Sequence, residues 1–172
     1  MACTSDITSG RGRVCKNSLG GNAELYIFNY VENPFTVVNG EATAINVLLT
    51  EAFRFEIEGD GNTLTENFVG ERQNGTSVNT QTLVTVLKKQ DAVTSAQLNL
   101  LIKGYPQAVV KDRNGVYHAL GIDDGIDFTI DATTGGAKTD LNGYTLTGVS
   151  TTGDFSPKLD SATITAFLAL VA

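Results

Sequence analysis

The amino-acid sequence predicts a mainly β protein, an antiparallel β-barrel or β-sandwich with one flanking α-helix. Short apolar runs alternate with polar residues, and alternation with period two places every second side chain on one face of a sheet. The 172 residues include 18 glycines, and turn-forming residues separate the runs. Only residues 91–104 combine helical spacing with helix-end signals. These three observations together predict the fold class.

Length and composition predict one domain spanning residues 1–172, since a chain of this size buries roughly 70% of its unfolded surface. Apolar residues make up 41% of the chain and charged residues 18%, which excludes a charge-rich disordered protein. Lys and Arg number 12 against 19 Asp and Glu, for a net charge of -7. No segment gathers basic residues into a stripe, so we expect no high-affinity nucleic-acid binding.

Residues 1–21 predict a polar, Gly-rich N-terminal leader or arm. Its start has no apolar run and therefore no signal peptide, and the longest apolar stretch, 166–172, is too short to span a bilayer. We expect synthesis and first use in the cytoplasm, with no membrane partner. Cys3 and Cys15 lack the CxxC spacing of zinc ligands. We expect two reduced thiols, or a disulfide formed after cell lysis.

Ala23–Val31 predicts a central strand because both of its faces are apolar. One face carries Leu25 and Ile27, and the other carries Tyr26, Phe28 and Tyr30. Phe53–Glu58 predicts a strand with one wet face, in which Phe53, Phe55 and Ile57 point inward.

Thr76–Leu87 predicts a further strand and the natural partner of Phe53–Glu58. Its alternation separates two faces. Leu83 and Leu87 lie on one face, and Val78, Thr80, Thr82, Val84 and Val86 lie on the other.

Residues 58–76 predict a long loop that cannot order itself. Fixing the backbone costs about 1–2 kcal/mol per residue, whereas Leu64, Phe68 and Val69 each return only about 2 kcal/mol on burial. We therefore expect either a mobile loop or one completed by a neighbouring subunit. The pair Glu71 and Arg72 is either solvated or paired across that contact. The candidate inter-subunit residues are Leu64, Glu66, Phe68, Val69, Glu71 and Arg72.

Asp91–Gly104 predicts the flanking helix. Asp91 or Thr94 caps its start and Gly104 supplies a left-handed stop. The apolar stripe of Leu98, Leu101 and Ile102 predicts a lid that covers one sheet.

The C-terminal half predicts a hairpin at Gln107–Leu120, turned by Asn114 and Gly115. Further strands are expected at Gly125–Asp131 and Tyr144–Val149, joined by a Gly-rich link at 133–138. Ala162–Val171 predicts a strand or a short helix, and its Thr-Ile-Thr start favours the strand.

No motif of nucleophilic, metal or phosphate chemistry occurs, and the single histidine, His118, lies on a predicted strand. The acidic residues Asp123, Asp124, Asp127 and Asp131 lack the ligand spacing of a calcium loop, which favours a solvated strand face. We expect no catalytic, cofactor-binding or metal-binding residues and a protein that is not an enzyme.

The order of these elements resembles the tail tube (major tail) proteins of tailed bacteriophages. The resemblance is carried by the strand–loop–strand at Phe53–Leu87, the helix that follows it, and the stretch TIDATTGGAKTDLNGYTL at Thr129–Leu146. It spans most of residues 20–150. Residues 1–21 have no clear counterpart in it, so a related head–tail connector or ring protein stays open.

The resemblance implies a virion structural protein that self-assembles into rings, of six subunits in the family, stacked as a tail tube. Its partners would be copies of itself and other virion proteins, and DNA would pass through without specific binding. Assembly would take place in the host cytoplasm. A carbohydrate- or receptor-binding β-sandwich is the rival from another class, with Tyr26, Tyr30, Tyr105, Tyr117 and Tyr144 as candidate ring faces.

Overall fold

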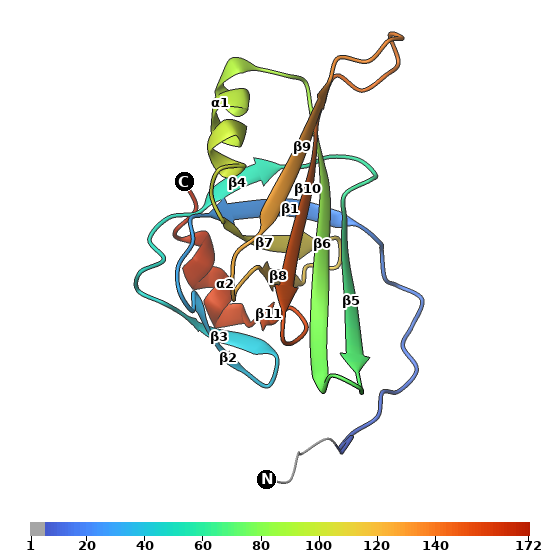
Figure 1. Ribbon diagram of the computed structural model, residues 1–172, viewed down its shortest axis with the longest axis vertical. Coiled ribbons are helices and arrows are strands. Elements are labelled where there is room, and N and C mark those ends of the chain that lie inside the picture. The colour runs from blue at the N-terminus through green and yellow to red at the C-terminus, as the bar shows by residue number, and fades with distance from the viewer. Residues whose placement is uncertain (1–5) are drawn as a thin grey trace.

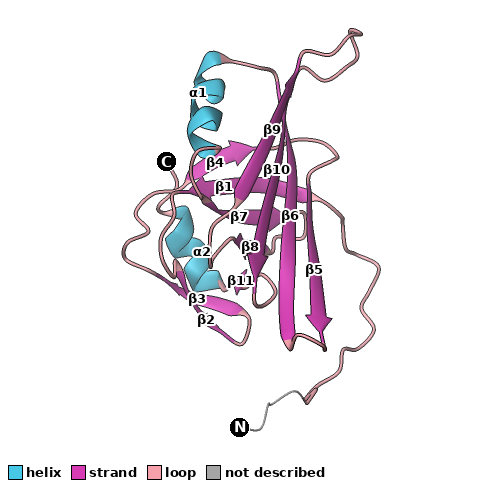
Figure 2. Ribbon diagram, in the orientation of Figure 1, coloured by secondary structure: helices cyan, strands magenta, loops and turns pink. Residues whose placement is uncertain are grey.

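The computed structural model describes residues 6–172, which form two β-sheets and two helices (Figure 1, Figure 2). The large sheet joins seven strands in the order β2, β3, β11, β8, β7, β1, β4, and the small sheet joins β5, β6, β10 and β9. The strands are β1 Asn22–Phe28, β2 Phe35–Val38, β3 Glu41–Ile45, β4 Phe53–Glu56, β5 Thr63–Glu71, β6 Thr76–Lys88, β7 Gln107–Asp112, β8 Tyr117–Leu120, β9 Asp127–Thr133, β10 Gly143–Thr152 and β11 Lys158–Leu159. The helices are α1 Ala92–Leu101 and α2 Ser161–Leu168.

The large sheet is the middle layer, with the small sheet on one face and α2 on the other (Figure 1). The long strands of the small sheet follow the long axis of the molecule, and β1, β4 and β7 run across it (Figure 2). Crossed sheets of this kind share one core between their inner faces.

Strand β1 explains why the large sheet is covered on both sides. Leu25 and Ile27 join the core shared with the small sheet, whereas Tyr26 and Phe28 join the core beneath α2. All four side chains are buried. The prediction of a strand buried on two apolar faces is confirmed, and β1 pairs on both sides, with β7 and with the edge strand β4.

The predicted fold class is confirmed as a sandwich of mostly antiparallel sheets, and the barrel alternative is wrong. Both sheets end in edge strands that pair with no further strand of residues 6–172: β2 and β4 in the large sheet, β5 and β9 in the small one. A barrel would have paired those edges.

The predicted pairing of Phe53–Glu58 with Thr76–Leu87 is wrong, because these segments belong to different sheets. Strand β4 pairs with β1, and β6 pairs with β5 and β10. Alternation specifies which face a side chain occupies but not which strand lies alongside, and the sequence offered no register signal between the two segments.

The prediction that residues 58–76 form a long loop unable to order itself within one chain is also wrong. Residues Thr63–Glu71 form β5, paired in unbroken antiparallel register with β6 from Thr63–Val84 to Glu71–Thr76. Three apolar side chains and short hairpin bonds are not all that orders this segment. The 13-residue β6 offers a long template whose other edge is already paired with β10.

The C-terminal segment forms helix α2, so the preferred prediction of a strand at Ala162–Val171 is wrong. Asp160 caps the helix, its carboxylate accepting a hydrogen bond from Thr163 N at 2.7 Å. The helix then buries Phe167 completely against the large sheet. The sequence contains a helix N-cap signal at this point, Asp160 followed by Ser161 and Ala162. The β-branched residues Thr163–Thr165 favoured a strand more strongly in the sequence-based prediction.

The flanking helix α1 and the β7–β8 hairpin lie where the sequence placed them. Asp91 is the N-cap, accepting from Thr94 N at 2.7 Å. The predicted left-handed stop at Gly104 is wrong, because its φ is not positive and Ile102 ends the helix. In the hairpin, Gly115 has φ +83°, and the backbone N–H of Asn114 donates to Asp112 Oδ1 at 2.8 Å.

Replacing the cap of α2, Asp160→Ala, is expected to lower the free energy of unfolding by about 1 kcal/mol. The N–H of Thr163 loses its acceptor while the rest of α2 is unchanged. Urea titration followed by far-ultraviolet circular dichroism measures the difference. Asp124→Ala is the matched control, an exposed aspartate whose carboxylate accepts no hydrogen bond among the residues described. Equal effects of the two substitutions would contradict the capping role.

Candidate assembly surface

The small sheet has one face turned away from the core, and that face carries few charged residues. Strand β6 buries Asn79, Gln81, Leu83, Thr85 and Leu87 and leaves its alternate residues partly exposed. Its cross-strand register places matching residues of the other three strands on the same side. This outer face consists of Thr63, Thr65, Asn67, Val69 and Glu71 on β5, Thr76, Val78, Thr80, Thr82, Val84, Val86 and Lys88 on β6, Thr145, Thr147, Val149 and Thr151 on β10, and Asp127, Thr129, Asp131 and Thr133 on β9.

Threonine and valine dominate the outer face, and its one basic side chain is Lys88 at the end of β6. Three of its valines are substantially exposed: Val69 is 54% exposed, Val78 44% and Val149 39%. Its acidic residues are Asp127 and Asp131 on the edge strand β9, exposed as the sequence indicated, and Glu71 at the end of β5. Lys88 is salt-bridged to Glu58 at 3.5 Å.

The two edges of the small sheet are open and run in opposite directions. Each of the three pairings from β5 through β6 and β10 to β9 is antiparallel, so β5 and β9 are antiparallel to each other. A free edge presents unpaired N–H and C=O groups and is a template for another strand. An edge β5 placed beside the β9 of another copy would form an ordinary antiparallel pair.

The structure divides the six candidate inter-subunit residues into two groups. Leu64 and Glu66 point into the protein's own interior: Leu64 packs against the core, and Glu66 is held by internal hydrogen bonds. Phe68 is 40% exposed, and its ring packs on Phe155 with 5.1 Å between centroids. Val69, Glu71 and Arg72 are exposed near the β5–β6 turn.

Glu66 anchors the open strand β5 to the rest of the molecule. Its carboxylate accepts from Ser156 N at 2.7 Å, Ser156 Oγ at 2.8 Å and Asn79 Nδ2 at 2.9 Å. Desolvation acts to raise the pKa of Glu66, but these hydrogen bonds and the charge of Lys158 together hold it below its usual value. No sequence pattern could predict this network, because Ser156 lies 90 residues from Glu66.

The residues considered for chemistry or ligand binding are mostly scattered or buried. His118 is half-buried, 3.6 Å from Asp112, and burial lowers its pKa. Within residues 6–172, no cluster of three or more His, Cys, Asp or Glu side chains is arranged to hold a metal ion. Three of the five tyrosines lie in the core, namely Tyr26, Tyr117 and Tyr144.

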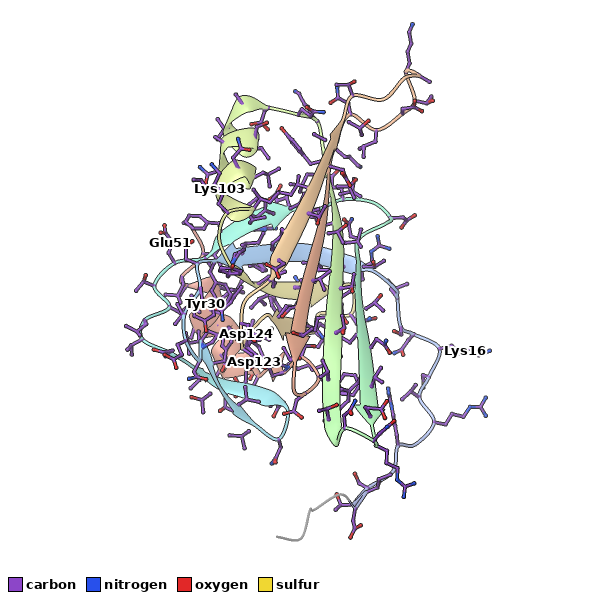
Figure 3. All side chains as sticks on the ribbon, viewed as in Figure 1. Lys16, Tyr30, Glu51, Lys103, Asp123 and Asp124 are labelled. Carbon is purple, nitrogen blue, oxygen red and sulfur yellow. The ribbon has the colours of Figure 1, made fainter. Side chains whose placement is uncertain are left out.

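Tyr30 and Tyr105 are the tyrosines left exposed. Tyr30 donates to the backbone oxygen of Asp123 at 2.9 Å, beside Asp124 (Figure 3). The five candidate ring faces therefore do not form one platform.

The N-terminal arm has neither helix nor strand over residues 6–21 and is almost wholly exposed. Its C-terminal end is held by two hydrogen bonds between the Leu19 backbone and the Asn114 side chain, each 2.9 Å, and by one from Arg113 N to Gly21 O at 3.1 Å. Lys16 points away from both sheets (Figure 3). Cys15 is exposed, and Cys3 lies outside the described residues.

No protein-family model matches the chain, and neither a curated protein nor a solved structure matches it significantly. Neither α1 nor α2 has the length and apolar composition that crossing a bilayer requires.

Proposed function

We propose that this chain is a structural subunit that assembles with copies of itself into closed rings through edge strands β5 and β9. The phage tail tube is the assembly it most resembles, and a head–tail connector ring is the nearest variant. The observation that carries the proposal is the small sheet, whose two open edges are antiparallel to each other.

Ring closure would convert both exposed edges into hydrogen-bonded pairs, which removes the aggregation hazard of a free edge. It would also join the outer faces of all subunits into one continuous sheet. A heterologous contact of this kind closes into a ring when the rotation between subunits divides a full turn.

The outer face suits a conduit for DNA. Its acidic residues Glu71, Asp127 and Asp131 outnumber its one basic residue, Lys88, which is salt-bridged to Glu58. With a single, already paired Lys the sequence-independent attraction to DNA is weak, so DNA would pass along such a surface without binding.

The carbohydrate- or receptor-binding sandwich is the weaker candidate. Aromatic platforms need exposed ring faces, and Tyr26, Tyr117 and Tyr144 are each less than 7% exposed. Only Tyr30 and Tyr105 would remain for ligand contact.

Cysteine cross-linking tests the ring. In a background carrying Cys3→Ser and Cys15→Ser, the double variant Thr65→Cys/Thr129→Cys places thiols on the outer face of β5 and β9. We expect a ladder of multimers on non-reducing gels, and circular particles by negative-stain microscopy. A second double variant, Asn67→Cys/Thr129→Cys, tests a β5–β9 register that is shifted by one outward-facing residue of β5.

The matched control joins Thr65→Cys with Thr36→Cys, an exposed position on β2 far from the β9 edge. It should give no ladder. A monomer by light scattering at every concentration, together with no cross-link in either β5–β9 variant, would refute the ring.

A further inference from the structure

A cleft of about 1000 Å³ lies between α1 and the strands β1 and β4. Apolar side chains on its walls are left open to solvent: Phe53 is 42% exposed, Leu100 64% and Tyr105 64%. Leu98 is the only fully buried residue of helix α1. The helix therefore covers the apolar side chains beneath it only in part. Figure 1 shows α1 and β4 together in the upper half of the molecule.

The strand that borders this cleft is an open edge of the large sheet. β4 is the last strand in the sheet order, and β1 is its sheet partner. Val171 in the C-terminal segment forms an isolated β-bridge with Ala52, just before β4. The outer edge of Phe53–Glu56 itself pairs with no further strand of residues 6–172. Four residues of backbone therefore border an apolar cleft.

The other open edge of the same sheet, β2, lies at the opposite end of that sheet (Figure 1). Its four residues include Val37, 42% exposed, and Val38, 52% exposed. The two edges thus match in length and both carry exposed apolar side chains.

The chain directions of the two edges also match. From β2 to β4 the sheet contains five antiparallel pairings and one parallel pairing, β3 with β11. β2 and β4 consequently run in opposite directions. Copies placed end to end would bring β2 of one beside β4 of the next as an antiparallel pair.

Charge favours the same contact. Residues 31–47, which contain β2 and β3, carry exposed Glu32 and Glu41 and no basic residue. The cleft walls carry three basic residues, Arg54, Lys88 and Lys89, and two acidic residues, Glu56 and Asp91. Lys89 is exposed and takes part in none of the ion pairs formed by residues 6–172.

We propose that the cleft between α1 and β4 is the docking site for edge strand β2 of a second copy of this chain. Val38 would enter the cleft while β2 extends the large sheet across the contact. Val37 pairs with Ala42 of the α2-side core and so lies on the opposite face of β2. The inference rests on the proposed ring and adds its axial contact: β5 and β9 close a ring, and β2 and β4 join one ring to the next.

A contact between two different surfaces builds an open stack when the series of copies that it joins does not close on itself. Four residues of pairing bind weakly alone. Every subunit of a ring makes the contact at once, and simultaneous engagement raises avidity by orders of magnitude over one contact. Right-handed sheet twist implies that successive rings are rotated about the stacking axis.

The test uses the full chain with Val38→Glu or Leu100→Glu, each placing a charge at one half of the contact. Both side chains are exposed, so the fold should survive, and an unchanged thermal midpoint checks this. By negative stain the unaltered chain should form long stacks, and each variant single rings, with mean stack length reduced at least about tenfold. Val116→Glu, an exposed valine outside both edges, should stack normally.

Mixing the two variants gives the decisive result. A Val38→Glu ring keeps its cleft and a Leu100→Glu ring keeps its β2 edge, so mixing should produce paired rings and no longer stacks. Long stacks from either variant alone would overturn the docking site.

The β5–β9 cross-link separates the two proposals. Rings that cross-link normally but stack regardless of Val38 and Leu100 refute the axial contact alone. Linear multimers that depend on Val38 without any β5–β9 cross-link refute the ring and keep the contact. An unaltered chain with neither cross-link nor end-to-end multimers refutes both.

Discussion

Phe167→Ala is expected to lower the free energy of unfolding by about 3–5 kcal/mol, the range for truncating a fully buried aromatic residue. Phe167 has no exposed surface. Its ring centroid lies 5.6 Å from that of Tyr26, 6.1 Å from Phe28 and 6.2 Å from Phe35. The substitution therefore opens a cavity among three aromatic rings that cannot collapse together.

The measurement is urea unfolding monitored by circular dichroism and by tyrosine fluorescence. Leu168→Ala is the control in the same turn of α2, because Leu168 is 40% exposed and should lose less than about 1 kcal/mol. A loss at Phe167 no larger than at Leu168 would mean that α2 does not hold down the large sheet.

Glu66→Gln is expected to destabilise the protein by roughly 2–3 kcal/mol at pH 7. The carboxylate accepts hydrogen bonds from Ser156 and Asn79, and bonds to a charged group are worth about 1.5–3 kcal/mol. A neutral amide keeps the shape but offers one acceptor oxygen in place of two. Ser156 N or Oγ then loses its partner.

The pH dependence of this effect has a definite sign. Because the pKa of Glu66 is lowered in the folded protein, its contribution is fully present above the unfolded pKa, about 4.3. That contribution is lost as pH falls through the lower folded pKa. The stability gap between the native chain and Glu66→Gln should shrink as the pH is lowered from about 5.

Urea titrations at pH 7, 5, 4 and 3 measure that gap. Glu58→Gln is the matched control, since Glu58 is exposed and pairs only with Lys88 at the surface, where such pairs contribute about 0–1 kcal/mol. A gap that stays constant from pH 7 to pH 3 would show that Glu66 does not act through its charge.

Local patterns were sufficient wherever a segment's neighbours in sequence are its neighbours in space. The Asn114–Gly115 turn fixed the β7–β8 hairpin, and the Asp91 cap fixed the start of α1. Two apolar faces on Ala23–Val31 predicted that β1 is central. Each signal acts within a few residues, so no distant contact was needed to interpret it.

The candidate assembly surface was only partly predictable. The valine–threonine alternation of Thr76–Leu87 separated the two faces of β6 correctly, but both faces contain apolar residues. Which one meets the core depends on β5 and β10, because Leu64 and Leu146 complete the buried side. Hydrophobicity alone would have buried the valines.

The sequence by itself determined that the chain is mainly β with a helix after β6, because period-two alternation, turn residues and caps are local, but it left barrel and sandwich open. Tertiary structure decided the rest. Residues 63–71 became a strand because β6 supplies a long template, and Ser161–Leu168 became a helix because Phe167 fills an aromatic pocket on the large sheet. It also decided which edges stay open, since an edge is defined by the absence of a partner, and that depends on every other strand.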